Sequence, residues 1–204
     1  MKKRLSSLFV IMIVATILGA CSNYKFKPDV NYPIEDFTMT DHRGNTVTLE
    51  DFKGEPWLAM FIFTNCTTVC PPMTFNMTEI QSNLIERGVE DYKIVAFSVD
   101  PEFDTPEVLT NYLSLYPVPD DSKWHLLTGY DQTFIEQFAL DSFKTLVKKP
   151  ADGGEVMHMV TFHLVDEKGT LVKNYSGYSE AEGGVPFDTI AIDIKTLIED
   201  RLGK

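Results

Sequence analysis

Basic residues are scarce in this chain. Its 204 residues include 18 lysines and arginines against 30 aspartates and glutamates, which gives a formal net charge of -12. A nucleic-acid-binding protein needs clustered lysine and arginine side chains to neutralise phosphates, so this composition argues against a nucleic-acid partner. The acidity instead fits a solvated surface that is kept soluble by self-repulsion.

An apolar run of bilayer-spanning length is missing at the N-terminus. Residues 8–20 are uncharged and follow a basic start at residues 2–4, but this run is shorter than the roughly 20 residues that a spanning helix needs. The pattern is typical of an export signal. It ends in Leu18-Gly19-Ala20-Cys21, which resembles a bacterial lipobox, in which the cysteine becomes the lipid-bearing N-terminus.

The N-terminal pattern predicts three parts of the chain. Residues 1–20 are the lipoprotein signal peptide, residues 21–33 are a tether lipidated on Cys21, and residues 34–204 are the folded domain. Several acyl chains on one residue anchor a protein stably, so we expect it on the extracytoplasmic face of the cell membrane. The alternative is an ordinary cleaved signal with a chance cysteine.

Cysteine is also scarce, because only Cys66 and Cys70 remain once Cys21 is set aside. In an exported protein such a pair can be a structural bridge, a redox couple or a metal site. Across one helical turn the two Cβ atoms would lie about 5–6 Å apart. A disulfide needs about 3.5–4.5 Å, so the spacing favours a metal over a permanent bridge.

The order of predicted elements is that of a thioredoxin-like α/β fold with an extra N-terminal β-hairpin and an insertion. Cys66 follows the first buried strand, and sites in such sheets form at the carboxyl ends of the parallel strands. A nearby helix N-terminus would lower the thiol pKa. The predicted segments are a hairpin at 37–49, buried strands at 57–63 and 93–99, helices at 74–87, from 106 and at 187–202, a short strand at 124–127, a loop at 148–154 and a second hairpin at 159–175.

Four histidines are available as a further ligand. We expect His42 to be exposed in a hairpin turn and His125 to be a partly buried structural residue. His163 is expected on the outer face of its strand. His158 stands at the start of that strand, after the loop, from which it could reach the cysteines. The residues alone leave the choice among these four open.

Three motifs and one histidine together closely resemble the Sco/SenC family over essentially the whole domain. The motifs are Cys66-Thr-Thr-Val-Cys70-Pro71, the segment 98–107 (Ser-Val-Asp-Pro-Glu-Phe-Asp-Thr-Pro-Glu) and the segment 124–129 (Trp-His-Leu-Leu-Thr-Gly), with His158. The resemblance implies a thioredoxin-like protein that binds copper and helps to assemble the CuA centre of cytochrome c oxidase. Its partner would be the CuA-bearing subunit.

Carried to this chain, the resemblance makes Cys66, Cys70 and His158 the copper ligands and gives Asp100 a supporting role near the site. Two thiolates suit Cu(I), and an added imidazole also suits Cu(II). Zinc would accept the same ligands. Met159 stands where family members often carry serine. A soft extra ligand or, more simply, a core methionine would explain it.

The rival predictions are enzymes. A peroxidase would need a proline where Phe63 stands and a distant arginine, and no arginine lies between Gly88 and Asp200. A thiol-disulfide oxidoreductase using a redox disulfide between Cys66 and Cys70 is the stronger alternative. It can coexist with copper delivery, because a dicopper thiolate target needs reduced cysteines.

Overall fold

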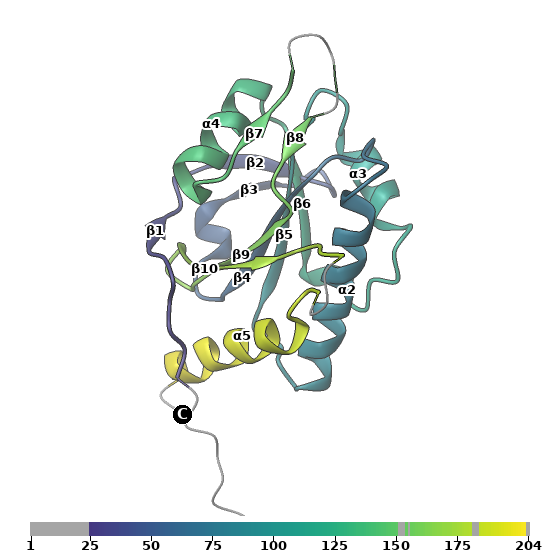
Figure 1. The fold of residues 1–204 in the computed structure, drawn as a ribbon. Helices are drawn as coiled ribbons and strands as arrows, with labels where there is room; N and C mark the ends of the chain where they lie inside the picture. Colours follow the sequence, from purple (N-terminus) through teal and green to yellow (C-terminus); the bar gives the residue numbers. More distant parts are fainter. Residues whose placement is uncertain (1–24, 151–153, 155, 181–183, 203–204) are drawn as a thin grey trace, which may run out of the picture.

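The two apolar runs predicted as buried strands lie at the centre of a mixed β-sheet. A computed structural model describes residues 25–150, 154, 156–180 and 184–202. In these residues the main sheet has eight strands in the order β1-β10-β9-β4-β5-β6-β2-β3 (Figure 1). Strands β7 and β8 form a separate two-stranded sheet.

The helices and strands follow one another along the chain with the following bounds. They are β1 (Tyr32–Pro33), β2 (Thr38–Asp41), β3 (Thr46–Thr48), the 3-10 helix η1 (Leu49–Phe52), β4 (Trp57–Ile62), α2 (Cys70–Glu86), β5 (Lys93–Ser98), α3 (Pro106–Leu113), η2 (Asp121–Lys123), β6 (Trp124–Thr128), α4 (Gln132–Phe143), β7 (Val147–Lys148), β8 (Met157–His158), β9 (Thr161–Val165), β10 (Thr170–Ser176) and α5 (Phe187–Leu202).

The topology confirms the predicted thioredoxin-like fold. Strands β4, β5 and β6 are parallel, and β9 pairs antiparallel with β4. Helices α2 and α5 pack against each other beside the sheet (Figure 1). The extra hairpin, β2–β3, adds to the edge of β6. Helix α4 and the short β7–β8 pair form the insertion between β6 and β9.

Helix α4 was not among the predicted elements, and its packing explains why it is stable. Asp131 caps its N-terminus by accepting a hydrogen bond from the Phe134 backbone N–H. Its buried Phe138 and Phe143 lie 5.4 and 5.6 Å from the ring centre of Phe97 on β5. Aromatic burial of this kind stabilises the helix beyond its local propensity.

Two of the four histidines lie deeper than predicted. His42 is 6% exposed and accepts a hydrogen bond from the Leu126 backbone N–H on Nδ1. His163 is 2% exposed, and its Nδ1 lies 2.7 Å from Asn174 Oδ1. The outer-face prediction for His163 is therefore wrong, because α4 covers that face and places Phe143 5.0 Å from the imidazole. His125 is partly buried, as predicted.

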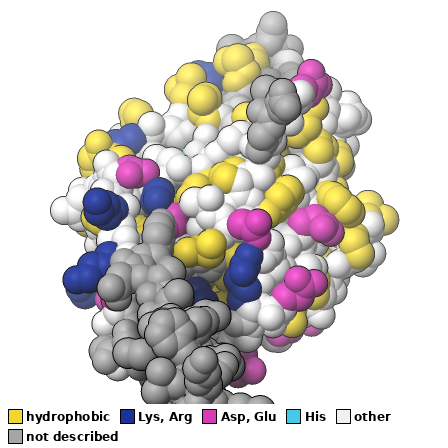
Figure 2. Space-filling view, turned by 60° about the horizontal axis from the view of Figure 1, so that its bottom comes forward, with side chains coloured by type: hydrophobic (Ala, Val, Ile, Leu, Met, Phe, Trp, Pro, Cys, Tyr) yellow, Lys and Arg dark blue, Asp and Glu magenta, His cyan; other side chains and the backbone are white. Residues whose placement is uncertain are grey.

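Charged side chains of both signs are interspersed around α5. Figure 2 shows lysine and arginine next to aspartate and glutamate on this face, with hydrophobic side chains scattered among them. Arg201, for example, pairs with Asp91 at 2.9 Å, and Lys195 with Glu199 at 3.9 Å. The acidic excess therefore does not form a patch of one sign on the part of this face that the structure describes.

The free energy of unfolding is expected to fall as the pH drops from about 6.5 to about 4. Burial lowers the pKa of His163 from 6.5 to about 4. Below pH 6.5 the unfolded chain binds a proton there and the folded chain does not. Protonation of the unfolded chain therefore lowers the free energy of unfolding as the pH falls from 6.5 to about 4. For this buried histidine the loss is about 1.4 kcal/mol per pH unit.

Urea denaturation at a series of pH values measures this loss. The His163→Leu variant should lose the share of the pH slope that His163 contributes, because the exposed Asn174 amide can bond to water instead. An unchanged slope between pH 6.5 and 4 in this variant would contradict the assignment.

Candidate metal centre

Cys66 and Cys70 lie where the chain passes from β4 into α2, at the carboxyl edge of the parallel strands. Helix α2 begins at Cys70, earlier than predicted, with prolines next in its first turn. The segment from Cys66 to Val69 is not helical, so the helical separation assumed for the two thiols does not apply. The Cys70 backbone N–H donates to Cys66 Sγ at 3.4 Å. The Cys66 sulfur thus satisfies one of the unpaired N–H groups at the helix start.

The two thiols differ in acidity. Burial by itself raises the pKa of Cys66, but hydrogen bonds from the backbone N–H groups of Cys70 and Thr68 lower the pKa below its ordinary value. The Thr68 hydroxyl also lies 3.6 Å from Cys66 Sγ. Burial raises the pKa of Cys70 far above its ordinary value. Cys66 is therefore the more easily ionised thiol, and Cys70 holds its proton until something displaces it.

His158 lies against Cys70. Its Nε2 is 3.2 Å from Cys70 Sγ, and its Nδ1 is 3.1 Å from the Met159 carbonyl oxygen. A carbonyl only accepts, so Nδ1 carries the proton and Nε2 presents its lone pair to the sulfur. The ring also packs edge-to-face on Phe63 at 5.8 Å. A hydrogen bond that fixes the tautomer in this way is typical of metal-binding histidines.

The structure thus brings together the three residues predicted as ligands. Both cysteines are free thiols, and both are buried. Within the described ranges, no three histidine, cysteine or acidic side chains are grouped tightly enough to form a finished metal-binding set. The donors fit copper by their chemistry, because two sulfurs and one unprotonated imidazole nitrogen are soft to intermediate ligands.

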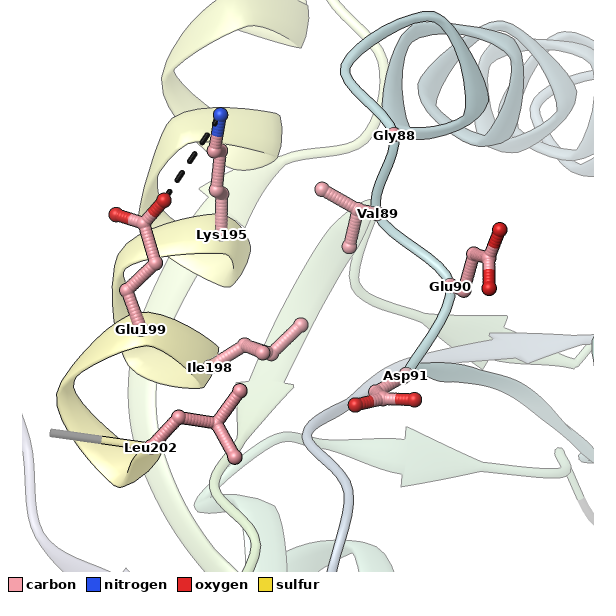
Figure 3. A pocket seen from close by; sticks show the side chains of 8 residues that line it. All are labelled: Gly88, Val89, Glu90, Asp91, Lys195, Ile198, Glu199 and Leu202. Carbon is pink, nitrogen blue, oxygen red and sulfur yellow. Dashed lines mark ion pairs between the residues drawn. The ribbon is translucent and has the colours of Figure 1, made fainter. Parts of the chain in front are cut away.

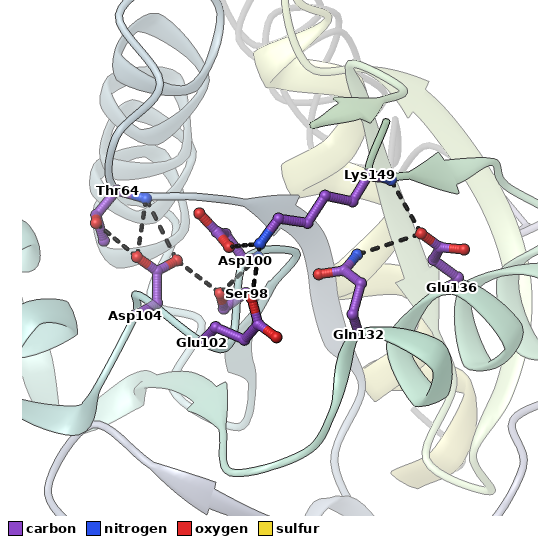
Figure 4. A network of polar contacts seen from close by, with 8 residues as sticks. All are labelled: Thr64, Ser98, Asp100, Glu102, Asp104, Gln132, Glu136 and Lys149. Carbon is purple, nitrogen blue, oxygen red and sulfur yellow. Dashed lines mark hydrogen bonds and ion pairs between the residues drawn. The ribbon is translucent and has the colours of Figure 1, made fainter. Parts of the chain in front are cut away.

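Asp100 is tied to the segment that carries His158 rather than to the thiols. Its Oδ1 pairs with Lys149 Nζ at 2.8 Å, and Glu102 Oε2 pairs with the same ammonium at 3.0 Å (Figure 4). Lys149 follows directly on β7, and β7 pairs with β8 so that Val147 lies opposite His158. The Lys149 backbone N–H also donates to Glu136 on α4 at 2.9 Å.

A second acidic residue of the same motif supports the cysteine side of the site. Asp104 is fully buried, and its Oδ1 accepts a hydrogen bond from the Thr64 hydroxyl at 2.6 Å (Figure 4). Its Oδ2 accepts from the Ser98 hydroxyl at 2.6 Å, and Ser98 Oγ accepts from the Asp100 backbone N–H at 3.1 Å. These bonds fix the loop ahead of Cys66 to the end of β5.

The prediction that Met159 is a core residue is wrong. Met159 is 54% exposed and Met157 is 55% exposed, so both neighbours of His158 face solvent. No local pattern in the sequence pointed to Lys149. The role of Asp104 could have been suspected, because it lies in the same motif as Asp100.

Cys21 lies outside the described residues, as do all of residues 1–24. Among the residues that are described, no helix is both long and apolar enough to cross a bilayer.

A surface hollow of about 270 Å³ lies far from the cysteines. It is formed between α5 and residues 88–91, with Val89, Ile198 and Leu202 along its apolar side (Figure 3). Gly88 follows the C-terminal end of α2, whereas Cys70 begins the helix. A helix of 17 residues is about 25 Å long, so this hollow does not belong to the site.

Comparison with known protein families gives a match over most of the chain. A family model described as SCO1/SenC matches residues 27–193. The "SCO1 protein homolog" of Bacillus subtilis (strain 168) is 44% identical over 184 residues, which cover 90% of this chain and 92% of that protein.

Solved structures with similar folds agree with this match. A SCO1/SenC family lipoprotein from Bacillus anthracis has a TM-score of 0.79 and 41% identity, covering 86% of this chain and all of the other. BsSco, a member of the Sco family of cytochrome c oxidase assembly proteins with an identified disulfide switch, has a TM-score of 0.76 and 45% identity, with coverage of 85% and 98%. Copper-bound ScoI of Bradyrhizobium japonicum has a TM-score of 0.64 and 29% identity, with coverage of 80% and 98%.

Proposed function

Because the chain belongs to the SCO1/SenC family, we propose that it is a copper-binding assembly factor that delivers copper to the CuA centre of cytochrome c oxidase. The observation that carries this proposal is the 3.2 Å contact between His158 Nε2 and Cys70 Sγ. It joins an imidazole from β8 to the Cys70 thiol, which lies 88 residues away in the sequence. A buried structural thiol would have no need of such a partner.

Cys66, Cys70 and His158 are the proposed ligands. Cys66 touches Cys70 through the N–H···S hydrogen bond, and Cys70 touches His158 through sulfur and nitrogen. Cys66 and His158 therefore both lie next to Cys70, the middle donor of the proposed set. Binding replaces the Cys70 proton by the metal, because only the thiolate is a strong ligand.

Asp100 acts in this proposal as a positioning residue. Together with Glu102 it holds Lys149, and Lys149 continues the strand that pairs with the strand bearing His158. The ion pairs therefore orient the imidazole towards Cys70 without Asp100 touching the metal. Partly exposed ion pairs contribute about 0–1 kcal/mol each, so the expected influence on copper affinity is modest.

A thiol-disulfide oxidoreductase is the second candidate, and the unequal acidity of the two thiols favours it. The Cys66 thiolate would attack a disulfide of the target and form a mixed disulfide. Cys70 would then attack the Cys66 sulfur and release the target as a dithiol. The target gains two electrons and two protons as a Cys66–Cys70 disulfide forms. The low exposure of the thiols, 5% for Cys66 and 0% for Cys70, disfavours attack on a bulky target and favours a small ion.

The copper-delivery proposal is tested on the oxidase itself. Cells that lack this protein should make an oxidase that keeps its haems but contains little copper in CuA, because only the thiolate-bound centre depends on the delivery site. The measurement is the CuA absorption and electron paramagnetic resonance signal of the purified oxidase. A full CuA signal in the deletion strain would overturn the proposal, and recovery after adding a dithiol reductant alone would favour the second candidate.

The membrane anchor is proposed to be a lipid on Cys21, after removal of residues 1–20. The described end of the tether runs beside the sheet, where the Asp29 backbone N–H donates to the Val172 carbonyl and β1 pairs with β10. The domain would therefore sit close to the membrane surface, on the extracytoplasmic face.

The Cys21→Ser variant should move from the membrane to the soluble extracytoplasmic fraction, because it has no thiol to acylate. One acyl methylene contributes about 0.8 kcal/mol of membrane binding, so loss of the lipid removes the whole anchor. Fractionation and mass spectrometry of the N-terminal peptide give the result. An unlipidated wild-type chain that still fractionates with membranes would contradict the anchor.

A further inference from the structure

The methionines of this protein are divided sharply by exposure. Six of the eight lie in described residues. Four of these, Met39, Met60, Met73 and Met77, are at most 2% exposed. The other two, Met157 and Met159, are 55% and 54% exposed and stand on either side of His158. Thioethers in a core need no further explanation, but two exposed thioethers around one proposed copper ligand do.

The local backbone separates the imidazole from the thioethers. Met157 and His158 form β8, where successive side chains point to opposite faces. The His158 side chain is directed inwards to Cys70, at 3.2 Å. Residues two apart along an extended chain have Cα atoms about 7 Å apart. The long, flexible side chains of Met157 and Met159 can therefore converge on one ion.

Thioether sulfur suits one form of copper in particular. It is a soft, neutral donor, so it binds Cu(I) in preference to Zn(II), which favours thiolate, imidazole and carboxylate ligands. It loses no proton on binding and holds the ion more weakly than thiolate. A pair of thioethers beside a buried thiolate site thus provides a surface position from which Cu(I) passes inwards or outwards.

We propose that Met157 and Met159 form an outer Cu(I) site that exchanges copper between the protein surface and the buried donors Cys66, Cys70 and His158. Only the transfer from the outer site to the buried donors rests on the proposed copper-binding function; binding of Cu(I) at the two methionines does not. No electron is transferred in the step, because the same Cu(I) ion exchanges neutral thioether ligands for thiolates and the Cys70 proton leaves to solvent.

The first experiment detects the outer site without the inner one. The full chain carrying Cys66→Ser and Cys70→Ser, with ¹³C-labelled methionine methyl groups, is titrated with Ag(I) as a stable probe for Cu(I). The methyl signals of Met157 and Met159 should shift, whereas those of the buried Met39 and Met60 should not. Unshifted Met157 and Met159 signals would overturn the proposal, even if the inner site proves not to bind copper.

The second experiment measures transfer. Reduced full-length chain takes Cu(I) from its coloured bicinchoninate complex, and the decay of colour gives the rate. Met157→Leu/Met159→Leu keeps the apolar surface but removes both sulfurs, and should slow transfer about tenfold while leaving the final affinity within about twofold. Leu115→Met, which adds an exposed thioether elsewhere, is the matched control and should not change the rate.

The leucine variant also tests the competing explanation, that the two methionines are an apolar contact for a partner protein. Under that explanation the leucine variant transfers Cu(I) as fast as the wild type, and Met157→Ser/Met159→Ser impairs only CuA assembly in cells. Equal transfer rates for the wild type and the leucine variant would therefore rule out the outer site.

Discussion

Replacing either Cys66 or Cys70 with serine is expected to abolish tight copper binding at the inner site in both oxidation states. A serine hydroxyl stays protonated at neutral pH and is a hard donor, whereas each thiolate contributes charge and soft ligation to the proposed site. The loss should exceed the about 10–100-fold that is typical when a residue merely orienting a ligand is removed. Equilibrium competition against a chelator, with the thiols kept reduced, gives both affinities.

Cys21→Ser provides the matched control for these variants, since it removes a cysteine that takes no part in the proposed site. It should bind one copper tightly per chain at the inner site, like the wild type. Oxidising the wild type to the Cys66–Cys70 disulfide should mimic the double serine variant, because a disulfide has no thiolate to offer. Near-normal copper affinity in Cys66→Ser would show that the helix-terminal thiol is not a ligand.

His158→Ala is expected to separate the two oxidation states of copper. Two thiolates can still hold Cu(I) as a near-linear pair, whereas Cu(II) prefers a planar set that includes nitrogen. The affinity for Cu(II) should therefore fall much more than that for Cu(I), and the thiolate-to-Cu(II) absorption band should move. Cells with this variant should assemble CuA poorly if capture of Cu(II) matters, and nearly normally if Cu(I) delivery or dithiol reduction is sufficient.

Lys149→Gln is the companion variant for His158→Ala. It breaks the ion pairs with Asp100 and Glu102 but keeps the imidazole, so it should move the Cu(II) band in the same direction by a smaller amount. Lys149→Arg should restore the band, because the charge is retained. Unchanged affinities and an unchanged band in His158→Ala would instead show that His158 is not a ligand, and the sulfur of Met159 or a nearby oxygen donor would become the better candidate.

Much of the fold could be predicted because the central strands are buried on both faces. The strands β4 and β5 are each six residues long, and nearly all of their side chains are buried. Their runs of mainly apolar residues can therefore be recognised in the sequence without knowledge of the surrounding fold. Helix α3 was equally predictable: Thr105 caps it by accepting the Val108 N–H bond, and Pro106 begins it. Helix α5 has the predicted bounds, from Phe187 to Leu202.

Features that depend on long-range contacts were less accessible from the sequence. His163 is flanked by apolar residues that alternate with it, which suggested an exposed position, but α4 buries that face of β9. His42 was expected in a solvated turn, yet it is buried and its Nδ1 accepts a hydrogen bond from the Leu126 backbone N–H on β6. The β7–β8 pair is only two residues long in each strand, too short for any periodic pattern to be visible.

The site itself was partly predictable. The motif around Cys66 and Cys70 placed both thiols at the carboxyl edge of the sheet, where they lie. The selection of His158 from four histidines came from the family resemblance, and in the structure its Nε2 lies 3.2 Å from Cys70 Sγ. The ion pairs of Lys149 with Asp100 and Glu102 could not be predicted, because these partners lie 49 and 47 residues away in the sequence.

The contact between Cys70 and His158 also has a consequence for the mechanics of the chain. A metal held by these two residues would be a removable cross-link that closes a loop of 88 residues. A permanent covalent link across a loop of roughly this size would lower the entropy of the unfolded chain by the equivalent of about 4.5 kcal/mol. Copper uptake would therefore fasten the short β7–β8 pair, which already contacts the core through His158, and raise the melting temperature. Transfer of the ion to a partner would remove this constraint and let the pair move more freely.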